Sequence, residues 1–401
     1  MALKDTIRQL ATDISNDIID IRRHLHQHPE LSFHEFETSA YIRRKLEELD
    51  IPCQVVAETG VLATIHGGLG PGKVIALRAD MDALAITDNK ETAYRSLNEG
   101  VMHACGHDAH TSMLLGVARI LKEMEFRFRG TVKLIFQPAE EILPGGALKV
   151  IRDGALTDPK VDLVIGQHVM PTLTAGNVGI RKGRFMASMD EISIVIKGIG
   201  GHGAAPHQSV DPVIAGATAI VVLQQLISRM NNPAIPSVLS FGKFQSNGTF
   251  NVIPDEVLIE GTFRTMDENW RSRAIQEIQH ITKSVAEGLG CTSEINIRKG
   301  YPSLFNKLST ADTISCYMEE YLGKQQVVDN NLWMASEDFA YYPLETDAFF
   351  YLLGVGKEGC ESPSLHTSLF DINEDAIETG MGLMTYIAFR YLDTDLESVS
   401  F

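Results

Sequence analysis

The 401-residue sequence is poor in cysteine and in positive charge. Its five cysteines are odd in number and widely scattered, which makes a poor framework for disulfides. Lysine and arginine number 35 against 52 acidic residues, and a formal net charge of −17 disfavours a nucleic-acid partner. No stretch approaches the apolar length of a membrane span, and the N-terminal segment lacks the apolar run of a signal peptide. We therefore expect a cytoplasmic protein that binds neither nucleic acid nor membrane.

The most informative segment that is present is HACGHDAH, residues 103–110. It combines three imidazoles, a thiol and a carboxylate, and zinc and its neighbours prefer thiolate and imidazole ligands. Cys105 and His107 are two residues apart, so one loop can direct both at one ion. Residues 111–124 have helical apolar spacing, and we expect Asp108 to cap that helix. A polar loop at a helix start has the same pattern, so a metal site needs ligands from elsewhere.

Short apolar runs alternate with helical patterns along the first and last parts of the chain. Strands are predicted at 73–82, 131–141, 161–168 and 347–356, and helices at 36–49, 111–124, 145–153 and 374–392. This alternation predicts an α/β fold with a mixed, largely parallel sheet flanked by helices. Ligands of such sheets bind beyond the carboxyl ends of the strands. The polar residues expected there are Asp80, Asp82, Glu140, Glu141 and His168.

The middle of the chain has a different pattern. Residues 189–198 alternate apolar and polar side chains, as in a sheet with one exposed face. A glycine- and histidine-rich loop, a long helix, two strands, a second helix and a final strand follow. This β-α-β-β-α-β order predicts a ferredoxin-like α+β domain. We predict a catalytic domain formed by 1–186 and 301–401, with 187–300 inserted into it.

The Glu140–Glu141 pair suits a division of labour at a metal site. One carboxylate can bind metal while the other acts as general base on a water whose pKa the metal lowers. Taken alone, a Glu-Glu pair is more often a solvated turn, and a lone histidine such as His168 or His366 is more often a buried structural residue. Each of these residues supports a metal site only if the fold brings their segments close together.

The ordered set of motifs resembles the M20 metallopeptidase family, in its aminoacylase and amidohydrolase branch. The motifs are RRHLHQHPELSFHEFET, LRADMDAL, MHACGHDAHTSMLLG, FQPAEE, GQHVMP, IKGIGGHGAAPHQSVDP, NVIPDEVLIEGTFRT, MASEDFAYY and SLHTSLF. Each motif is weak alone, but the ordered set covers almost the whole chain. The resemblance implies a two-metal catalytic domain with an inserted lid that also forms a homodimer.

The resemblance also implies roles for individual residues. Glu140 would be the general base, Asp82 would orient the ligands, and His202 would polarise the scissile carbonyl, in cis or from a dimer partner. Asn251 and Arg264 would hold the substrate carboxylate, as a guanidinium can through two hydrogen bonds. Cys105 would bridge two divalent ions. The implied metal ligands are Cys105, His107, Glu141, His168 and His366.

These expectations predict a metal-dependent amidohydrolase that cleaves N-acyl amino acids to a carboxylic acid and a free amino acid. A dipeptidase on the same site is an alternative, because a peptide is also an N-acyl amino acid. A non-catalytic metal- or ligand-binding protein on a hydrolase scaffold is another, although a binding module needs no general base. The ligand types accept zinc, nickel, manganese or cobalt. Neither the acyl group nor the preferred amino acid follows from the sequence.

Overall fold

The computed structural model describes residues 2–360 and 362–392, and the chain divides into two compact units. Unit 1 comprises Met1–Gly183, Phe305–Asn331 and Asp338–Phe401. Unit 2 comprises Arg184–Leu304 with the short segment Leu332–Glu337. The predicted insertion at 187–300 lies within the long segment of unit 2, but that prediction omits the short one.

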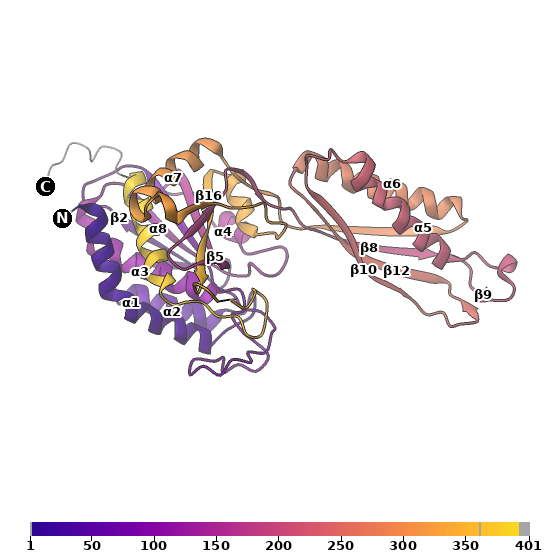
Figure 1. Cartoon of the computed structure of the whole chain (residues 1–401), viewed down its shortest axis with the longest axis horizontal. Helices are drawn as coiled ribbons and strands as arrows, with labels where there is room; N and C mark the ends of the chain where they lie inside the picture. The colour runs from indigo at the N-terminus through magenta and orange to yellow at the C-terminus, as the bar shows by residue number, and fades with distance from the viewer. Residues whose placement is uncertain (1, 361, 393–401) are drawn as a thin grey trace. The chain divides into compact units, whose positions relative to one another are not determined.

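Unit 1 is built on an eight-stranded mixed sheet (Figure 1). The strand order is β1-β2-β4-β3-β5-β16-β6-β15. The strands are β1 Cys53–Val56, β2 Gly60–His66, β3 Val74–Asp80, β4 Thr131–Gln137, β5 Leu163–Thr174, β6 Val178–Ile180, β15 Val327–Asp329 and β16 Asp347–Gly356. The four central strands β4, β3, β5 and β16 run parallel to their neighbours within that group. The predicted α/β fold with a largely parallel sheet is therefore confirmed.

Helices cover this sheet. They are α1 Leu3–Gln27, α2 Phe36–Glu47, α3 His107–Glu123, α4 Ala147–Arg152, α7 Leu308–Leu322 and α8 Ala376–Leu392. Helices α1, α3 and α8 pack against one another, and Gly116 lets them approach. A Cβ at Gly116 would lie 2.6 Å from Met381 Sδ on α8 and 3.3 Å from Ile18 on α1. A larger residue at Gly116 would force these helices apart.

Unit 2 carries a four-stranded antiparallel sheet in the order β10-β12-β8-β13. The elements are β8 Asp190–Lys197, α5 Pro212–Gln225, β10 Ser237–Ser246, β12 Glu256–Thr265, α6 Glu268–Gly288 and β13 Thr292–Lys299. Both helices pack on the sheet, on the same side of it (Figure 1). This is the predicted ferredoxin-like order. The short strands β7 Gly183–Met186, β9 Gly201–His202, β11 Val252–Ile253 and β14 Leu304–Asn306 form two small ribbons.

Helix α5 corrects one expectation from the sequence. Together with the π turn Leu226–Met230, it forms a segment, Pro212–Met230, that is long and apolar enough to cross a membrane by length and composition. Its mean hydropathy is 1.5, and 28% of it is buried. The expectation that no stretch approaches such a length is therefore wrong. One such helix is weak evidence for a membrane span, because apolar helices of other proteins pass the same test.

Candidate metal centre

The candidate site lies where the central strands of unit 1 end. Strands β3 and β4 are parallel, and Asp80 pairs with Gln137 at their last positions. Asp82 and the Glu140–Glu141 pair therefore leave the sheet at the same edge. Both segments carry buried carboxylates there: Asp82 is 1% exposed and Glu140 is 6% exposed.

His168 occupies a different position from the one predicted. Strand β5 does not end before His168 but continues to Thr174, and His168 pairs with Leu352 of β16. The reason is that β16 is long enough to pair with β5 beyond this point. His168 nevertheless reaches the site, because its ring projects from the sheet beside Cys105.

The loop that carries Cys105 turns sharply into α3. Gly106 has φ +86° and is the residue before the helix, which begins at His107. A side chain at Gly106 would be strained by this backbone and would meet Val169 at 2.5 Å. Asp108 is therefore not the helix cap that the sequence suggested but lies within the first turn. There its Oδ2 forms an ion pair with Arg22, at 2.8 Å from Nε, and lies 2.6 Å from His26 Nδ1.

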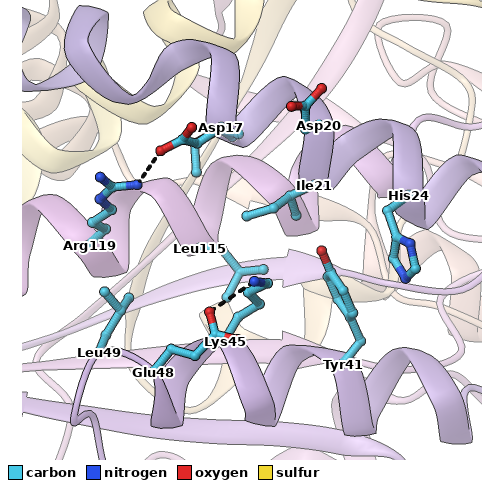
Figure 2. A pocket seen from close by; sticks show the side chains of 11 residues that line it. Asp17, Asp20, Ile21, His24, Tyr41, Lys45, Glu48, Leu49, Leu115 and Arg119 are labelled. Atoms are coloured by element: carbon cyan, nitrogen blue, oxygen red, sulfur yellow. Dashed lines mark hydrogen bonds and ion pairs between the residues drawn. The ribbon is translucent and has the colours of Figure 1, made fainter.

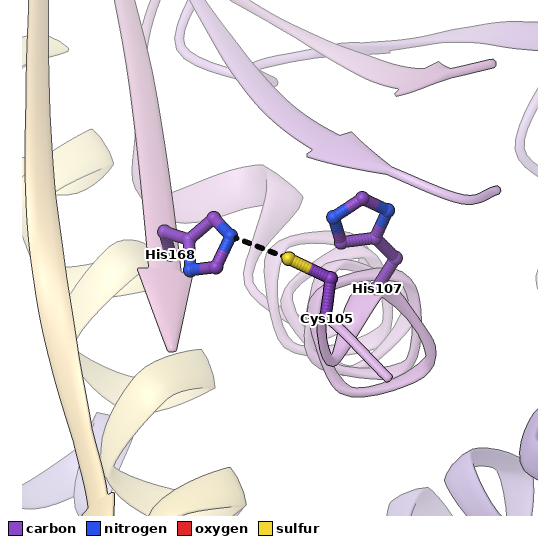
Figure 3. A group of neighbouring side chains, drawn as sticks. All are labelled: Cys105, His107 and His168. Atoms are coloured by element: carbon purple, nitrogen blue, oxygen red, sulfur yellow. Dashed lines mark hydrogen bonds between the residues drawn. The ribbon is translucent and has the colours of Figure 1, made fainter. Parts of the chain in front are cut away.

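Cys105, His107 and His168 form one group of potential ligands (Figure 3). Their ligand atoms all lie within 4.8 Å of one another, and all three residues are buried. Cys105 Sγ is 3.3 Å from His168 Nε2. His107 Nε2 is buried and has no hydrogen-bond partner among the residues that the structure describes. A buried imidazole nitrogen without a partner fits a position that a metal would occupy.

Cys105, Glu141 and His366 form a second group. His366 Nε2 lies 3.3 Å from Cys105 Sγ and 3.2 Å from Glu141 Oε1. The His366 backbone has φ +61°, which is uncommon for a residue with a side chain. The thiol is thus common to both groups, so the residues present fit two neighbouring ions that share one sulfur ligand. All five predicted ligands are brought together.

Asp82 contacts this constellation with both carboxylate oxygens. Its Oδ1 is 3.1 Å from His107 Nδ1, the ring nitrogen opposite the unpartnered Nε2. Its Oδ2 accepts hydrogen bonds from the backbone N–H of Glu141 at 3.0 Å and from Ser32 Oγ at 2.6 Å. Such outer partners fix the tautomer and direction of a ligating histidine.

His110 supports the same constellation from the second turn of α3. Its Nδ1 lies 2.5 Å from Asp80 Oδ1, and its Nε2 accepts from the backbone N–H of Val169 at 2.9 Å. Both ring nitrogens are therefore engaged within the protein. The ring therefore offers no free nitrogen to an ion.

The electrostatics of the site favour a cation. Burial, Glu141 and Glu140 together raise the pKa of the Cys105 thiol well above its usual range. Burial lowers the pKa of His107, but Asp80 and Asp82 overcome this effect and raise it to about 10. Nearby carboxylates contribute to both shifts, and a divalent ion would offset their negative charge and deprotonate the thiol.

Glu140 stands beside the ligands. His107, Glu140 and Glu141 bring ligand atoms within 4.8 Å of one another. Glu141 lies 3.2 Å from His366, and Glu140 is the neighbouring carboxylate beside the same histidine and thiol ligands. A carboxylate held there can accept a proton from a reacting water.

The predicted residues of unit 2 lie at two ends of its sheet. His202 of β9 pairs with Val252 of β11, which places Asn251 next to His202. Both side chains are exposed. Arg264 lies near the end of β12, half-buried, and donates to Met334 O at 3.3 Å and Ser336 Oγ at 3.4 Å. The structure therefore brings His202 and Asn251 together but not Arg264.

A pocket of about 440 Å³ lies elsewhere in unit 1, between α1, α2 and α3 (Figure 2). Its charged side chains are largely paired: Arg119 with Asp17 at 2.7 Å and Lys45 with Glu48 at 2.9 Å. It contains none of the five predicted metal ligands. The evidence for the candidate site is therefore its cluster of potential ligands, and this pocket is a separate feature.

Comparison with known proteins identifies the family. Residues 76–390 match the model of peptidase family M20/M25/M40. The chain belongs to this family. This M20 chain is 40% identical to the N-acetyl-L-cysteine deacetylase of Bacillus subtilis strain 168, over 96% of the chain and 90% of that protein. It is 42% identical to the N-acyl-L-amino acid amidohydrolase of Geobacillus stearothermophilus, over 76% of the chain and 81% of that protein.

A solved M20 structure is similar throughout. The YXEP protein of Bacillus subtilis, described as a dinuclear metal-binding peptidase, superposes with a TM-score of 0.82 at 34% identity. The match covers 96% of this chain and 99% of that one. The resemblance to the M20 family predicted from the motifs is therefore confirmed.

Several buried residues behind this M20 site did not follow from the sequence. Arg22 joins Asp108 to Asp371 at 2.7 Å, so it ties the α3 turn to the segment after His366. Arg78 pairs with Asp80 at 2.6 Å and with Asp338 at 2.9 Å. The signal that could have found Arg22 is the charged motif RRHLHQHPE, because arginine inside an amphipathic helix is seldom buried without a partner.

Proposed function

We propose that this M20 hydrolase cleaves the amide bond of N-acyl amino acids with the help of two divalent metal ions. The observation that carries the proposal is that two ligand groups share Cys105, with Glu140 beside them. The names of the two curated relatives support an N-acyl amino acid as substrate. Zinc, nickel, manganese and cobalt all suit the ligand types.

The protein's own residues supply the proton transfers. When bound, the ions would supply Lewis acidity and lower the pKa of a water. Glu140 accepts the proton of the attacking water and passes it to the amide nitrogen as the carbon–nitrogen bond breaks. The products are then a carboxylic acid and a free amine, and Glu140 returns to its carboxylate form.

Unit 2 supplies substrate recognition in this proposal. In the homodimer proposed below, Arg264 of one chain and Asn251 of the other bind the substrate carboxylate, and His202 beside that Asn251 polarises the scissile carbonyl. Burial lowers the pKa of Arg264, yet the guanidinium stays charged and can offer two parallel hydrogen bonds to a carboxylate.

We further propose that the protein acts as a homodimer. Strand β12 runs from the sheet end near His202 to Arg264, a span of roughly 27 Å for eight residues at about 3.4 Å each. A small substrate cannot touch both ends, so His202 and Arg264 of one chain would serve different sites. Exposed apolar residues on α5, among them Ile214 and Val221, at 57% and 69% exposure, support a protein partner.

The test is a kinetic screen with metal analysis of the same sample. Acetyl- and benzoyl-amino acids are compared with dipeptides of the same amino acids. Turnover of the acyl series above the dipeptides, with two ions per chain, is the expected result. The reverse preference would make the protein a dipeptidase, and no hydrolysis of any compound at saturating metal would leave a metal- or ligand-binding protein. The cytoplasmic location, and the absence of nucleic-acid and membrane partners, stay predictions.

A further inference from the structure

The motif HPELSFHEFET, residues 28–38, contains a buried carboxylate that the proposed chemistry does not use. Glu35 is the residue before α2, and it is fully buried. It lies more than one hundred residues before the Glu140–Glu141 pair. A buried carboxylate costs free energy unless its oxygens are hydrogen-bonded, so its partners indicate what it does.

Both Glu35 oxygens are engaged. Oε1 accepts from the backbone N–H of Ala139 at 2.8 Å, and Oε2 accepts from Thr59 Oγ1 at 2.7 Å. Thr59 is itself fully buried and stands directly before β2. Glu35 therefore connects the start of β2 to the residue immediately before Glu140.

The backbone of Ala139 adopts an unfavourable conformation that a hydrogen-bond partner such as Glu35 stabilises. Its φ of +52° lies in the left-handed region, where a residue with a Cβ is disfavoured by about 1 kcal/mol. Two hydrogen bonds stabilise this backbone conformation. Ala139 O accepts from Gly146 N at 2.9 Å, and Ala139 N donates to Glu35. This backbone conformation sets the direction in which Glu140 and Glu141 leave strand β4.

We propose that Glu35 is a positioning residue that holds the Ala139 turn, and through it Glu140 and Glu141, in the geometry needed for metal binding and proton transfer. The same motif also contacts the loop that follows β3. Ser32 Oγ donates to Asp82 Oδ2, and that oxygen also accepts from Glu141 N. The inference rests on the roles proposed for Glu140 and Glu141. Burial and then the nearby Asp82 raise the pKa of Glu35 to about 7.

Two substitutions of Glu35 distinguish a role of its hydrogen bonds from a role of its negative charge. Glu35→Ala removes both hydrogen bonds. Glu35→Gln keeps an acceptor for Ala139 N, and its amide N–H can donate to the Thr59 hydroxyl, while the negative charge is lost. A positioning role predicts rescue by glutamine, whereas an electrostatic role predicts that both variants are equally impaired.

The measurements are Zn²⁺ affinity, by competition with a chromogenic chelator, and kcat and KM on the best substrate of the screen. For Glu35→Ala we expect Zn²⁺ affinity to fall about 10- to 100-fold and kcat to fall by a similar factor, with KM little changed. For Glu35→Gln we expect both within about threefold of wild type, because both hydrogen bonds can still form. Asp162→Ala is the control, because Asp162 also accepts a backbone N–H, that of Val74 at 2.8 Å, but at the start of β3.

The inference is overturned if folded Glu35→Ala keeps wild-type affinity and kcat, or if the glutamine variant is as impaired as the alanine variant. If Glu35→Ala does not fold, Thr59→Val takes its place, since it removes one anchor of Glu35 and should lower both quantities to a smaller degree. An unchanged Thr59→Val protein would then overturn the inference. The Zn²⁺ measurement needs no substrate, so it distinguishes failure of this inference from failure of the proposed reaction.

Discussion

The two units of this chain bury charge in opposite ways. Unit 1 places a dense network of ionisable groups beneath the candidate site, where Arg22, Arg78, Asp80 and Asp108 are each at most 1% exposed. In unit 2, between Arg184 and Leu304, the described buried charges are one pair, Asp190 with Arg271, joined by two hydrogen bonds of 2.7 and 2.9 Å. The other buried residues described in that range are uncharged and mostly aliphatic or aromatic.

The contrast indicates that unit 1 holds its candidate metal ligands in fixed positions. Buried charges need fixed partners, and the partners of Arg22, which are Asp108 and Asp371, lie close in sequence to the predicted ligands His107 and His366. Unit 2 keeps a simple core and presents His202 and Asn251 to solvent. We therefore expect damage to unit 1 to remove metal and chemistry, and damage to unit 2 to affect stability or substrate binding.

The largest expected effect is loss of the thiol that both ligand groups share. Cys105→Ala should lose metal and, with it, activity down to the background rate, because one sulfur would serve both ions. Metal analysis and turnover of the purified variant measure this. Cys316→Ala, an exposed cysteine on α7, is the matched control and should keep both. Two ions per chain in Cys105→Ala would contradict the shared-sulfur arrangement.

Next in size is removal of the general base. Glu140→Gln should lower kcat by about 10²- to 10⁴-fold, because the amide cannot take up a proton, while metal content stays near wild type. Steady-state kinetics and metal analysis on one sample provide the test, with Glu123→Gln, at an exposed position at the end of α3, as the control. Near-normal turnover in Glu140→Gln would assign the base to another group.

The third effect falls on the stability of unit 2. Arg271→Met should lower the free energy of unfolding by about 3–5 kcal/mol, because Asp190 stays buried without its partner. Denaturant unfolding measures the loss. The double variant Arg271→Met with Asp190→Leu should recover part of it, since no unpaired charge remains. A single variant as stable as wild type would mean that water reaches Asp190.

A smaller effect is expected on substrate binding. Arg264→Met should raise KM about 10- to 100-fold, the contribution of a charge-assisted hydrogen bond, and leave metal content unchanged. Kinetics on an N-acyl amino acid and on its amide, which lacks the carboxylate, measure this. The variant and the wild type should differ little on the amide. An equal loss on both compounds would contradict a carboxylate-binding role.

The smallest effect concerns a helix cap in unit 2. Asp267 accepts from Trp270 N at 2.9 Å at the start of α6, and this bond lowers the pKa of Asp267. Asp267→Ala should cost about 1 kcal/mol at neutral pH. Because the folded-state pKa is lowered, the contribution is present above the usual carboxyl pKa and disappears as the pH falls through the folded value. Unfolding curves of both proteins at pH 7 and pH 3 should therefore converge at the lower pH.

Much of the fold follows from local pattern. The strands at 74–80, 131–137 and 347–356 and the order of elements in unit 2 agree with the apolar periodicity of the sequence. The predictions failed where a partner distant in the sequence decides the outcome. Strand β5 extends past His168 because β16 lies beside it, and Asp108 is drawn into α3 by Arg22 and His26 rather than capping it.

The sequence by itself determined which kinds of metal-ligating side chain this site contains and the family to which the chain belongs. Side-chain identity and the order of motifs are both properties of the sequence alone. Only the tertiary structure decided that Cys105 is common to two ligand groups and that Glu35 reaches Ala139. Those facts depend on distances between segments that are 36 to 261 residues apart, such as Cys105 with Glu141 and with His366. Such distances arise from the packing of strands and loops, which no local periodicity specifies.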